Sequence, residues 1–234
     1  DRGKHIQRNR ALAYLSRVYS WGFDETKFDE LEEEGIEVRN PCVNLKKAAE
    51  DSRERALDDV EIRNLLKNLP DSGIRDDIAD VYRLILLLAA RPGEVCRIRF
   101  DQIKDAEIVT GRDANGQDIT QQLKVLELPE TKKGTTLVQP LCEQVLDIIE
   151  RRRKASSSEY LFPAPADPKR HLREDALSKP LKDALPKLKT LPFRPHDLRG
   201  TAVTAMSNVV DDNGQKISQF LKARILNHKD SSVT

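Results

Sequence analysis

The hydrophobic periodicity of the chain changes character between residues 106 and 140, and this change constrains the fold more than any other feature. Short alternating or β-branched stretches there are separated by Ala114-Asn115-Gly116 and by Lys132-Lys133-Gly134, which are turn sequences typical of β-hairpins. Strands are therefore expected over 107–110, 119–128 and 135–139. The other periodic segments repeat at the helical interval, so the sequence predicts an α+β fold: a mostly helical domain with a small three-stranded antiparallel sheet.

Helical patterns flank this segment on both sides. Residues 8–23 carry apolar side chains at helical spacing. A second helix starts at Asp58 or Asp59 as N-cap, with Glu61 completing a capping box. The pattern over 78–89 predicts a deeply buried helix. The remaining helical patterns cover 141–149, 175–188, 197–210 and 215–221.

A polar stretch divides the chain. Residues 46–55 are polar or charged with few bulky apolar side chains, a composition typical of an interdomain linker. We therefore assign 1–45 to a helical segment of its own, 46–56 to the linker and 57–234 to the main domain. Within the main domain, the proline-rich segment 162–165 is expected to be a loop.

Composition excludes several classes of protein. The longest apolar run, 84–90, is far shorter than the roughly 20 residues that a membrane-spanning helix needs, and the first residues lack the apolar stretch of a signal peptide. The cysteines, Cys42, Cys96 and Cys142, are widely spaced and fit no metal-ligand pattern. This spacing favours a reducing compartment with neither a disulfide framework nor a zinc site.

The charges nearly cancel but are segregated along the chain. The 40 Lys and Arg residues balance 39 Asp and Glu, so the net charge of +1 does not by itself indicate nucleic-acid binding. Residues 24–34 carry seven acids against one base, 169–194 carry eight bases against three acids, and 151–154 are all basic. Such runs are usually solvated helix faces, and they indicate DNA binding only if the fold gathers them around a phosphate-binding site.

Signatures of common catalytic sites are missing from the sequence. Residues 111–116 have the glycine spacing of a phosphate-binding loop, but Gln117 stands where a lysine would have to reach the terminal phosphates. This segment is therefore expected to be a hairpin. The sequence also has no zinc-protease motif, no serine-hydrolase elbow and no carboxylate set arranged for magnesium, so we expect a mechanism without metal or other cofactor.

One candidate site is a helix start that reads His196-Asp197-Leu198-Arg199. His196 and Arg199 are three residues apart and share a face away from the apolar stripe of this helix. A cation in the first turn opposes the helix dipole, so Arg199 indicates a bound anion, which free backbone N–H groups would also bind. Alternatively, Asp197 caps the helix and Arg199 is a surface residue paired with an acid.

Three further segments carry candidate residues. Arg91 follows the most apolar helix and precedes Pro-Gly, so it is expected to be held in place; alternatively, it compensates the dipole at that helix's C-terminus. Lys132 and Lys133 stand at a predicted hairpin tip, where lysines are usually only solvated. His228 lies in the segment Leu226-Asn227-His228, where a lone histidine would normally be structural.

In this order, the four segments resemble the tyrosine recombinase (phage integrase) family. That family has an arginine in a GLRxGE context, a lysine in a β-hairpin, an HxLR helix start and an LGH turn before the nucleophilic tyrosine. The corresponding residues here are Ala90-Arg91-Pro92-Gly93-Glu94, Lys132, His196-Asp197-Leu198-Arg199 and Leu226-Asn227-His228. The resemblance covers residues 55–234. Residues 8–41 resemble the last helices of the family's core-binding domain, so 1–45 is interpreted as the C-terminal remnant of that domain.

The sequence departs from the family pattern at the turn, the hairpin and the nucleophile. Asn227 replaces the usual glycine, and asparagine accepts left-handed backbone angles better than most residues. Lys133 competes with Lys132, and the distance to Pro140 favours Lys132. The family's tyrosine lies about two and a half helical turns beyond the histidine, which is past Thr234. We therefore interpret the chain as truncated before its nucleophile and inactive as it stands.

The resemblance implies a prophage or mobile-element integrase that cuts and rejoins DNA through a 3′-phosphotyrosyl intermediate, without metal or ATP. The two arginines would clamp the scissile phosphate, the lysine would act as general acid, and the histidines would assist proton removal and bind the phosphate. The implied catalytic residues are Arg91, Lys132, His196, Arg199 and His228. The implied contacts to the DNA backbone are Lys133, Lys169, Arg170 and Arg194.

The resemblance also implies partners and a location. The partners are double-stranded DNA attachment sites, further copies of the chain that form a tetramer on DNA from monomers in isolation, and accessory DNA-bending proteins, with no membrane. The location is the cytoplasm of a bacterial host, at the nucleoid. Alternative functions are a type IB topoisomerase-like enzyme that relaxes DNA, a non-catalytic DNA-binding protein on the same fold, and a helical structural protein whose motifs are coincidental.

Overall fold

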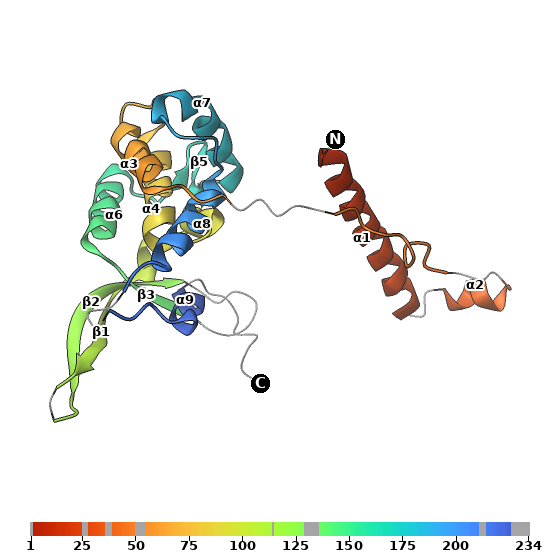
Figure 1. Ribbon diagram of the computed structural model, residues 1–234, viewed down its shortest axis with the longest axis horizontal. Helices are drawn as coiled ribbons and strands as arrows, with labels where there is room; N and C mark the ends of the chain where they lie inside the picture. Colours follow the sequence, from red (N-terminus) through yellow and green to blue (C-terminus); the bar gives the residue numbers. More distant parts are fainter. Residues whose placement is uncertain are drawn as a thin grey trace. The chain divides into compact units, whose positions relative to one another are not determined.

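The computed structural model describes residues 2–24, 28–35, 39–49, 55–113, 115–128, 136–210 and 214–225. The chain divides into two compact units, and each is described by itself (Figure 1). Unit 1 covers Asp1–Arg53 and unit 2 covers Glu54–Thr234.

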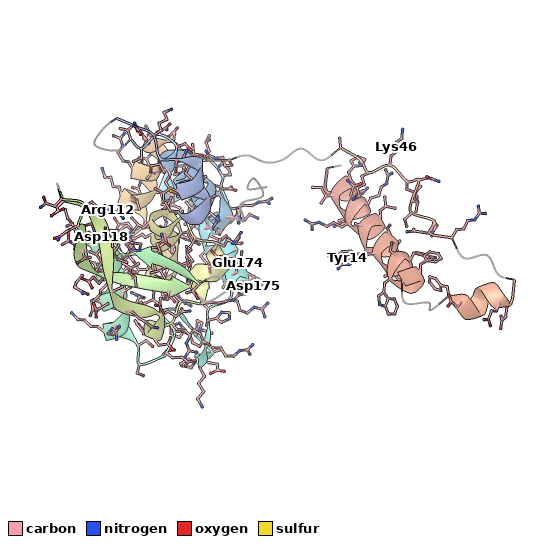
Figure 2. All side chains as sticks on the ribbon, turned by 90° about the horizontal axis from the view of Figure 1, so that it is seen from below. Tyr14, Lys46, Arg112, Asp118, Glu174 and Asp175 are labelled. Carbon is pink, nitrogen blue, oxygen red and sulfur yellow. The ribbon has the colours of Figure 1, made fainter. Side chains whose placement is uncertain are left out.

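Unit 1 is built on one long helix, α1 (Arg2–Asp24), which is followed by the short helix α2 (Asp29–Glu33). Residues 39–49 run back along α1. Asn9 holds them there, because its side-chain amide donates to the Ala48 carbonyl at 2.8 Å and accepts from the Ala48 N–H at 2.9 Å. The helix predicted over 8–23 is confirmed, but part of its apolar pattern is exposed. The side chain of Tyr14, for example, points away from the helix (Figure 2).

Unit 2 is organised around α4 (Asp76–Leu88). The apolar residues of this helix that were predicted to lie in the core are buried, namely Ile78, Val81, Tyr82, Ile85 and Leu88. Two helices pack against α4, α6 (Glu143–Ala155) and α8 (Pro195–Met206), while α7 (Ser178–Leu188) packs against α3 (Asp59–Asn68) (Figure 1). The helical period over 78–89 therefore identified the centre of the domain correctly.

The start of α3 confirms the predicted capping box and decides between its two candidate N-caps. Asp58 is the N-cap, and its carboxylate accepts from the backbone N–H groups of Val60 and Glu61 at 2.9 and 2.8 Å. The Glu61 carboxylate accepts in return from the Asp58 N–H at 3.2 Å. These bonds satisfy N–H groups that have no partner within the helix.

The predicted three-stranded antiparallel sheet is confirmed. Its strands are β1 (Ile103–Arg112), β2 (Asp118–Leu128) and β3 (Leu137–Pro140), in the order β1-β2-β3. Because β3 pairs only with 125–128, the outer part of β1 and β2 continues as a two-stranded ribbon. An ion pair of 2.9 Å between Arg112 and Asp118 lies at the far end of this ribbon (Figure 2). The segment with phosphate-loop spacing is thus part of a hairpin, as expected.

The structure also differs from the expectations in the following segments. The loop expected at 162–165 contains the hairpin strand β4 (Pro163–Ala164), which pairs with β5 (Asp167–His171), since proline excludes a helix but is compatible with an edge strand. The helix expected over 175–188 begins as the 3₁₀ helix η2 (Glu174–Leu177) before α7. The helix expected over 197–210 ends at Met206, because Val210 instead forms a β-bridge with Lys216.

Three short elements complete unit 2. These are α5 (Pro92–Cys96), the 3₁₀ helix η1 (Phe100–Gln102) and α9 (Gln219–Ile225), where a helix over 215–221 had been expected. Within the described residues, none of the helices combines the length and the apolar character needed to cross a membrane.

Candidate active site

Arg91 stands where the chain turns from α4 into α5. The turn is made at Ala89, whose φ of +49° is left-handed, a conformation that costs a residue with a Cβ roughly 1–2 kcal/mol. Pro92 then opens α5, which makes Arg91 the N-cap residue. Its backbone N–H and its guanidinium both donate to the Glu94 carboxylate, each at 2.7 Å. Arg91 is thereby held in place at the N-terminus of α5.

Arg199 lies in the first turn of α8, which begins with Pro195. Asp197 accepts from the Arg194 N–H at 2.8 Å and so caps this helix, as one of the two interpretations expected. Arg199 itself is not a surface residue, because only 6% of it is exposed. Its guanidinium Nη1 lies 3.6 Å from Oε2 of Glu94. The fold therefore brings Arg91 and Arg199 to the same carboxylate.

The electrostatics of this cluster favour an anion. Burial lowers the pKa of Arg199, the nearby charge of Arg91 lowers it further, and the Glu94 carboxylate partly offsets both effects. Arg91 and Arg199 thus bring two positive charges to the one Glu94 carboxylate. The dipole of α8 adds to the positive potential at its start. Guanidinium groups arranged in this way are suited to bind a negatively charged group such as a phosphodiester.

The sheet and α9 both lie near the C-terminal end of α4. The side chain of Gln139 on β3 donates to the Leu88 carbonyl at 3.1 Å, which ties the sheet to the end of α4, close to Arg91. α9 lies beside β3 (Figure 1). Lys222 on α9 donates to the Ser207 hydroxyl at 3.3 Å, which links α9 to the residue after α8. The elements that lead toward the predicted lysine and the second histidine thus contact the end of α4 and the residue after α8.

The other predicted site residues have the following places. His196 is exposed in the same turn as Arg199, and Arg194 is exposed just before it. Lys169 and Arg170 are exposed on β5, a separate element. Lys132, Lys133 and His228 fall outside the described residues; in the sequence, the two lysines come between β2 and β3 and the histidine comes after α9.

Glu94 is the residue that the sequence reasoning missed. The sequence signal for it is its place two residues after Pro92, which is that of a capping-box acid. Gly93, between Pro92 and Glu94, leaves room for a neighbouring side chain, since a Cβ at this position would lie 2.7 Å from Oε2 of Glu174. Glu174 belongs to η2, which packs on α5 (Figure 2). In the described part of the chain, no group of His, Cys, Asp or Glu side chains is arranged to hold a metal ion.

The sequence profile of the Phage integrase family matches residues 55–234, which is most of the chain. The chain belongs to the phage integrase family. This match begins within two residues of the start of unit 2. Membership of this family makes the chain a site-specific recombinase that acts on DNA. No curated protein sequence matches the chain.

Solved structures of the phage integrase family and its relatives share the fold. A lambda integrase tetramer bound to a Holliday junction has a TM-score of 0.58 and 16% sequence identity, and the match covers 100% of this chain and 71% of that one. The Tn1549 transposon integrase in complex with a circular intermediate DNA has a TM-score of 0.60 and 13% identity, with coverage of 94% and 78%. The XerA recombinase has a TM-score of 0.51 and 15% identity, with coverage of 80% and 60%. Because the matching profile is that of the phage integrases, a topoisomerase is not the favoured function.

Proposed function

We propose that this integrase cuts DNA at an attachment site and rejoins it through a 3′-phosphotyrosyl intermediate. A tyrosine oxygen attacks the scissile phosphorus, the bond from phosphorus to the 5′-oxygen breaks, and that oxygen leaves as a hydroxyl after taking up a proton. Rejoining reverses these steps. The phosphoester energy is conserved in the covalent intermediate, so the cycle needs no ATP.

The observation that carries this proposal is the pairing of Arg91 and Arg199 on Glu94. Guanidinium groups bind the non-bridging oxygens of a phosphate in a fork that lysine cannot reproduce. In a phosphoryl transfer, such donors stabilise the charge that builds up on these oxygens, an effect typically worth about 3 kcal/mol per donor. Glu94 contacts both guanidinium groups and so holds the two halves of the clamp near one point.

The proton transfers are assigned to the remaining predicted residues. Lys132, or Lys133 in its place, supplies the proton to the leaving 5′-oxygen, and His196 assists its removal from the tyrosine. His228 binds the phosphate. Support for the lysine comes from the sheet, whose strand β3 is hydrogen-bonded to the end of α4 near Arg91.

The attacking tyrosine is proposed to follow Thr234 in the gene. Of the tyrosines in the sequence, Tyr82 is fully buried in α4, its hydroxyl donates to the Leu177 carbonyl at 2.6 Å, and burial raises its pKa. Tyr14 and Tyr19 belong to α1 of the other unit. Tyr160 forms a β-bridge with Arg99 and stacks edge-on with a histidine. None of these contexts is that of the family's nucleophile.

The remaining partners are assigned from charge and from the neighbours. Lys169, Arg170, Arg194 and Lys133 would contact the DNA backbone, which positions the duplex without reading its sequence. A tetramer on DNA is supported by the lambda integrase tetramer on a Holliday junction, and assembly from monomers with accessory DNA-bending proteins completes the proposal. The enzyme would work at the nucleoid in the cytoplasm of a bacterial host.

The test is covalent trapping on a nicked attachment-site substrate, with the protein expressed from its gene together with the residues that follow Thr234. We expect a covalent protein–DNA complex in the wild type. Arg199→Ala should reduce its rate of formation by at least about 100-fold without unfolding the protein. Arg75→Ala is the matched control, because Arg75 is an exposed arginine at the opposite end of α4 from Arg91, about 20 Å away along the helix. Unchanged trapping by Arg199→Ala would contradict the clamp.

The same protein separates the alternative functions. Recombination between attachment sites identifies a recombinase, whereas relaxation of supercoiled DNA without recombination identifies a topoisomerase-like enzyme. Binding of DNA with no covalent complex, in a protein whose gene encodes no tyrosine soon after Thr234, identifies a non-catalytic DNA-binding protein.

A further inference from the structure

Thr201 joins the helix that carries His196 and Arg199 to a distant part of unit 2. It is 2% exposed and lies two residues beyond Arg199 in α8. Its hydroxyl donates to the Asp197 carbonyl at 2.8 Å and accepts from the backbone N–H of Leu57 at 2.9 Å. One buried hydroxyl thus connects the first turn of α8 with residue 57.

Residues 55–57 are the first described residues of unit 2, at the point where the chain enters it. The Arg55 carbonyl lies beside Gly200 of α8, where an added Cβ would be 3.5 Å away. The Arg55 guanidinium is paired with the carboxylate of Glu61. Glu61 also accepts from the N–H of Leu191, in the segment that leads into α8, at 3.0 Å. The entering chain is therefore bonded both to α8 and to the segment before it.

We infer that Thr201 is a positioning residue for the active site: its hydroxyl sets the first turn of α8 against the entering segment 55–57, and so sets the positions of His196 and Arg199. This inference rests on the proposed function, because it concerns the same site. Thr201 touches neither the arginine pair nor DNA in the proposed mechanism. It acts through the backbone of the helix that carries the reacting groups.

The energetics of the two hydrogen bonds give the expected size of the effect. Thr201→Val keeps the shape of the side chain but removes the hydroxyl, which leaves the buried N–H of Leu57 without its acceptor and so destabilises the present arrangement. The entering segment then has to shift toward another acceptor, and the first turn of α8 loses its support. In a site that depends on orientation, a displacement of about 1 Å can cost 100-fold in rate.

The experiment measures covalent complex formation on the nicked attachment-site substrate in single turnover, as a function of protein concentration. Thr201→Val should lower the rate at saturation by about tenfold or more, while the half-saturating concentration stays within about twofold, since no group that contacts DNA is lost. Thr201→Ser restores the hydroxyl and should restore the rate. If the valine variant does not fold, Thr201→Ala, which suits a helix better, replaces it with the same expectation.

A matched variant separates positioning from a general loss of stability. Ser72 is also buried, donates to the Leu69 carbonyl at 2.7 Å and accepts from the Ile74 N–H at 3.2 Å, but makes these bonds in the turn between α3 and α4. Ser72→Ala therefore loses the same two kinds of bond without touching α8. It should lower the free energy of unfolding by a similar amount and leave the rate at saturation unchanged.

The outcomes are distinct. A wild type that forms no covalent complex overturns the proposed function itself. A wild type that forms the complex, with Thr201→Val equally fast or with Ser72→Ala equally slowed, overturns the positioning role. A slow valine variant, a fast serine variant and an unaffected Ser72→Ala support it.

Discussion

The carboxylate of Asp80 offers the sharpest test of what holds unit 2 together. Asp80 lies in α4 with its side chain 1% exposed, and three arginines surround it. Arg83 and Arg151 approach Oδ1 at 2.8 and 2.6 Å, and Nε of Arg152 lies 3.0 Å from Oδ2. Because Arg151 and Arg152 belong to α6, this cluster pins α6 to α4. Replacing Asp80 with asparagine keeps the shape and removes the charge.

The size of the effect depends on which arginines can return to water. Arg151 is half exposed and can rehydrate, so the loss of its ion pair with Asp80 costs at most about 1 kcal/mol. Arg152 is only 12% exposed, and its charge would stay buried without compensation. Breaking a buried ion pair by removing one partner typically costs 3–5 kcal/mol. Because two of the three arginines are partly solvated, we expect Asp80→Asn to lower the free energy of unfolding by about 3 kcal/mol.

Urea unfolding followed by far-ultraviolet circular dichroism measures this loss. For a slope near 2 kcal/mol per molar urea, about 3 kcal/mol moves the midpoint of unit 2 down by about 1.5 M. Asp147→Asn is the matched control, because Asp147 is an exposed carboxylate on α6 whose field also acts on Arg151, and its loss should cost about 0.5 kcal/mol or less. The fluorescence of Trp21, the single tryptophan, reports on unit 1 and should not change. If the midpoint for Asp80→Asn falls no further than for Asp147→Asn, the reasoning is refuted.

Two further predictions concern Glu61 and Gly22. The hydrogen bond from Arg55 lowers the pKa of Glu61 below its ordinary value of 4.5, so its contribution to stability is complete above that value and is lost as the pH falls through the lowered pKa. Urea unfolding at several pH values should therefore show that Glu61→Gln lowers the free energy of unfolding by about 2 kcal/mol near neutral pH. This difference from the wild type should shrink in acid. A difference independent of pH would contradict the ion pair. A Gly→Ala change such as Gly22→Ala in α1 ordinarily stabilises a helix by about 1 kcal/mol. A Cβ at position 22 would overlap the ring of Phe28, so we expect a lower urea midpoint for unit 1 instead. A higher midpoint would show that the ring does not lie against Gly22.

The parts of the fold that follow from neighbours in sequence were predictable. The capping box of Asp58 and Glu61 needs residues three apart, and the hairpin that contains Gly116 needs a short turn between two strands. The burial of α4 follows from its apolar period, because a helix that is apolar on most faces has to lie inside. The two motifs that contain Arg91 and Arg199 could be recognised for a similar reason, because each lies within a few consecutive residues.

The candidate site itself depended on the fold. That Arg91 and Arg199 share Glu94, and that Arg199 is buried rather than solvated, are relations between α5 and α8 that local sequence does not encode. The hydrogen bond between Thr201 and Leu57 joins positions 144 residues apart, so no local sequence pattern predicts it.

The amino-acid order alone thus determined which segments form helices and strands and which residue types carry phosphate chemistry, because propensity, capping and periodicity act over a few residues. Tertiary structure alone decided which charges meet, how far each is removed from water and which backbone groups each hydroxyl joins. The strength of a charge or hydrogen bond depends on its distance to a partner and on its burial, and both exist only once α4, α5 and α8 have packed together.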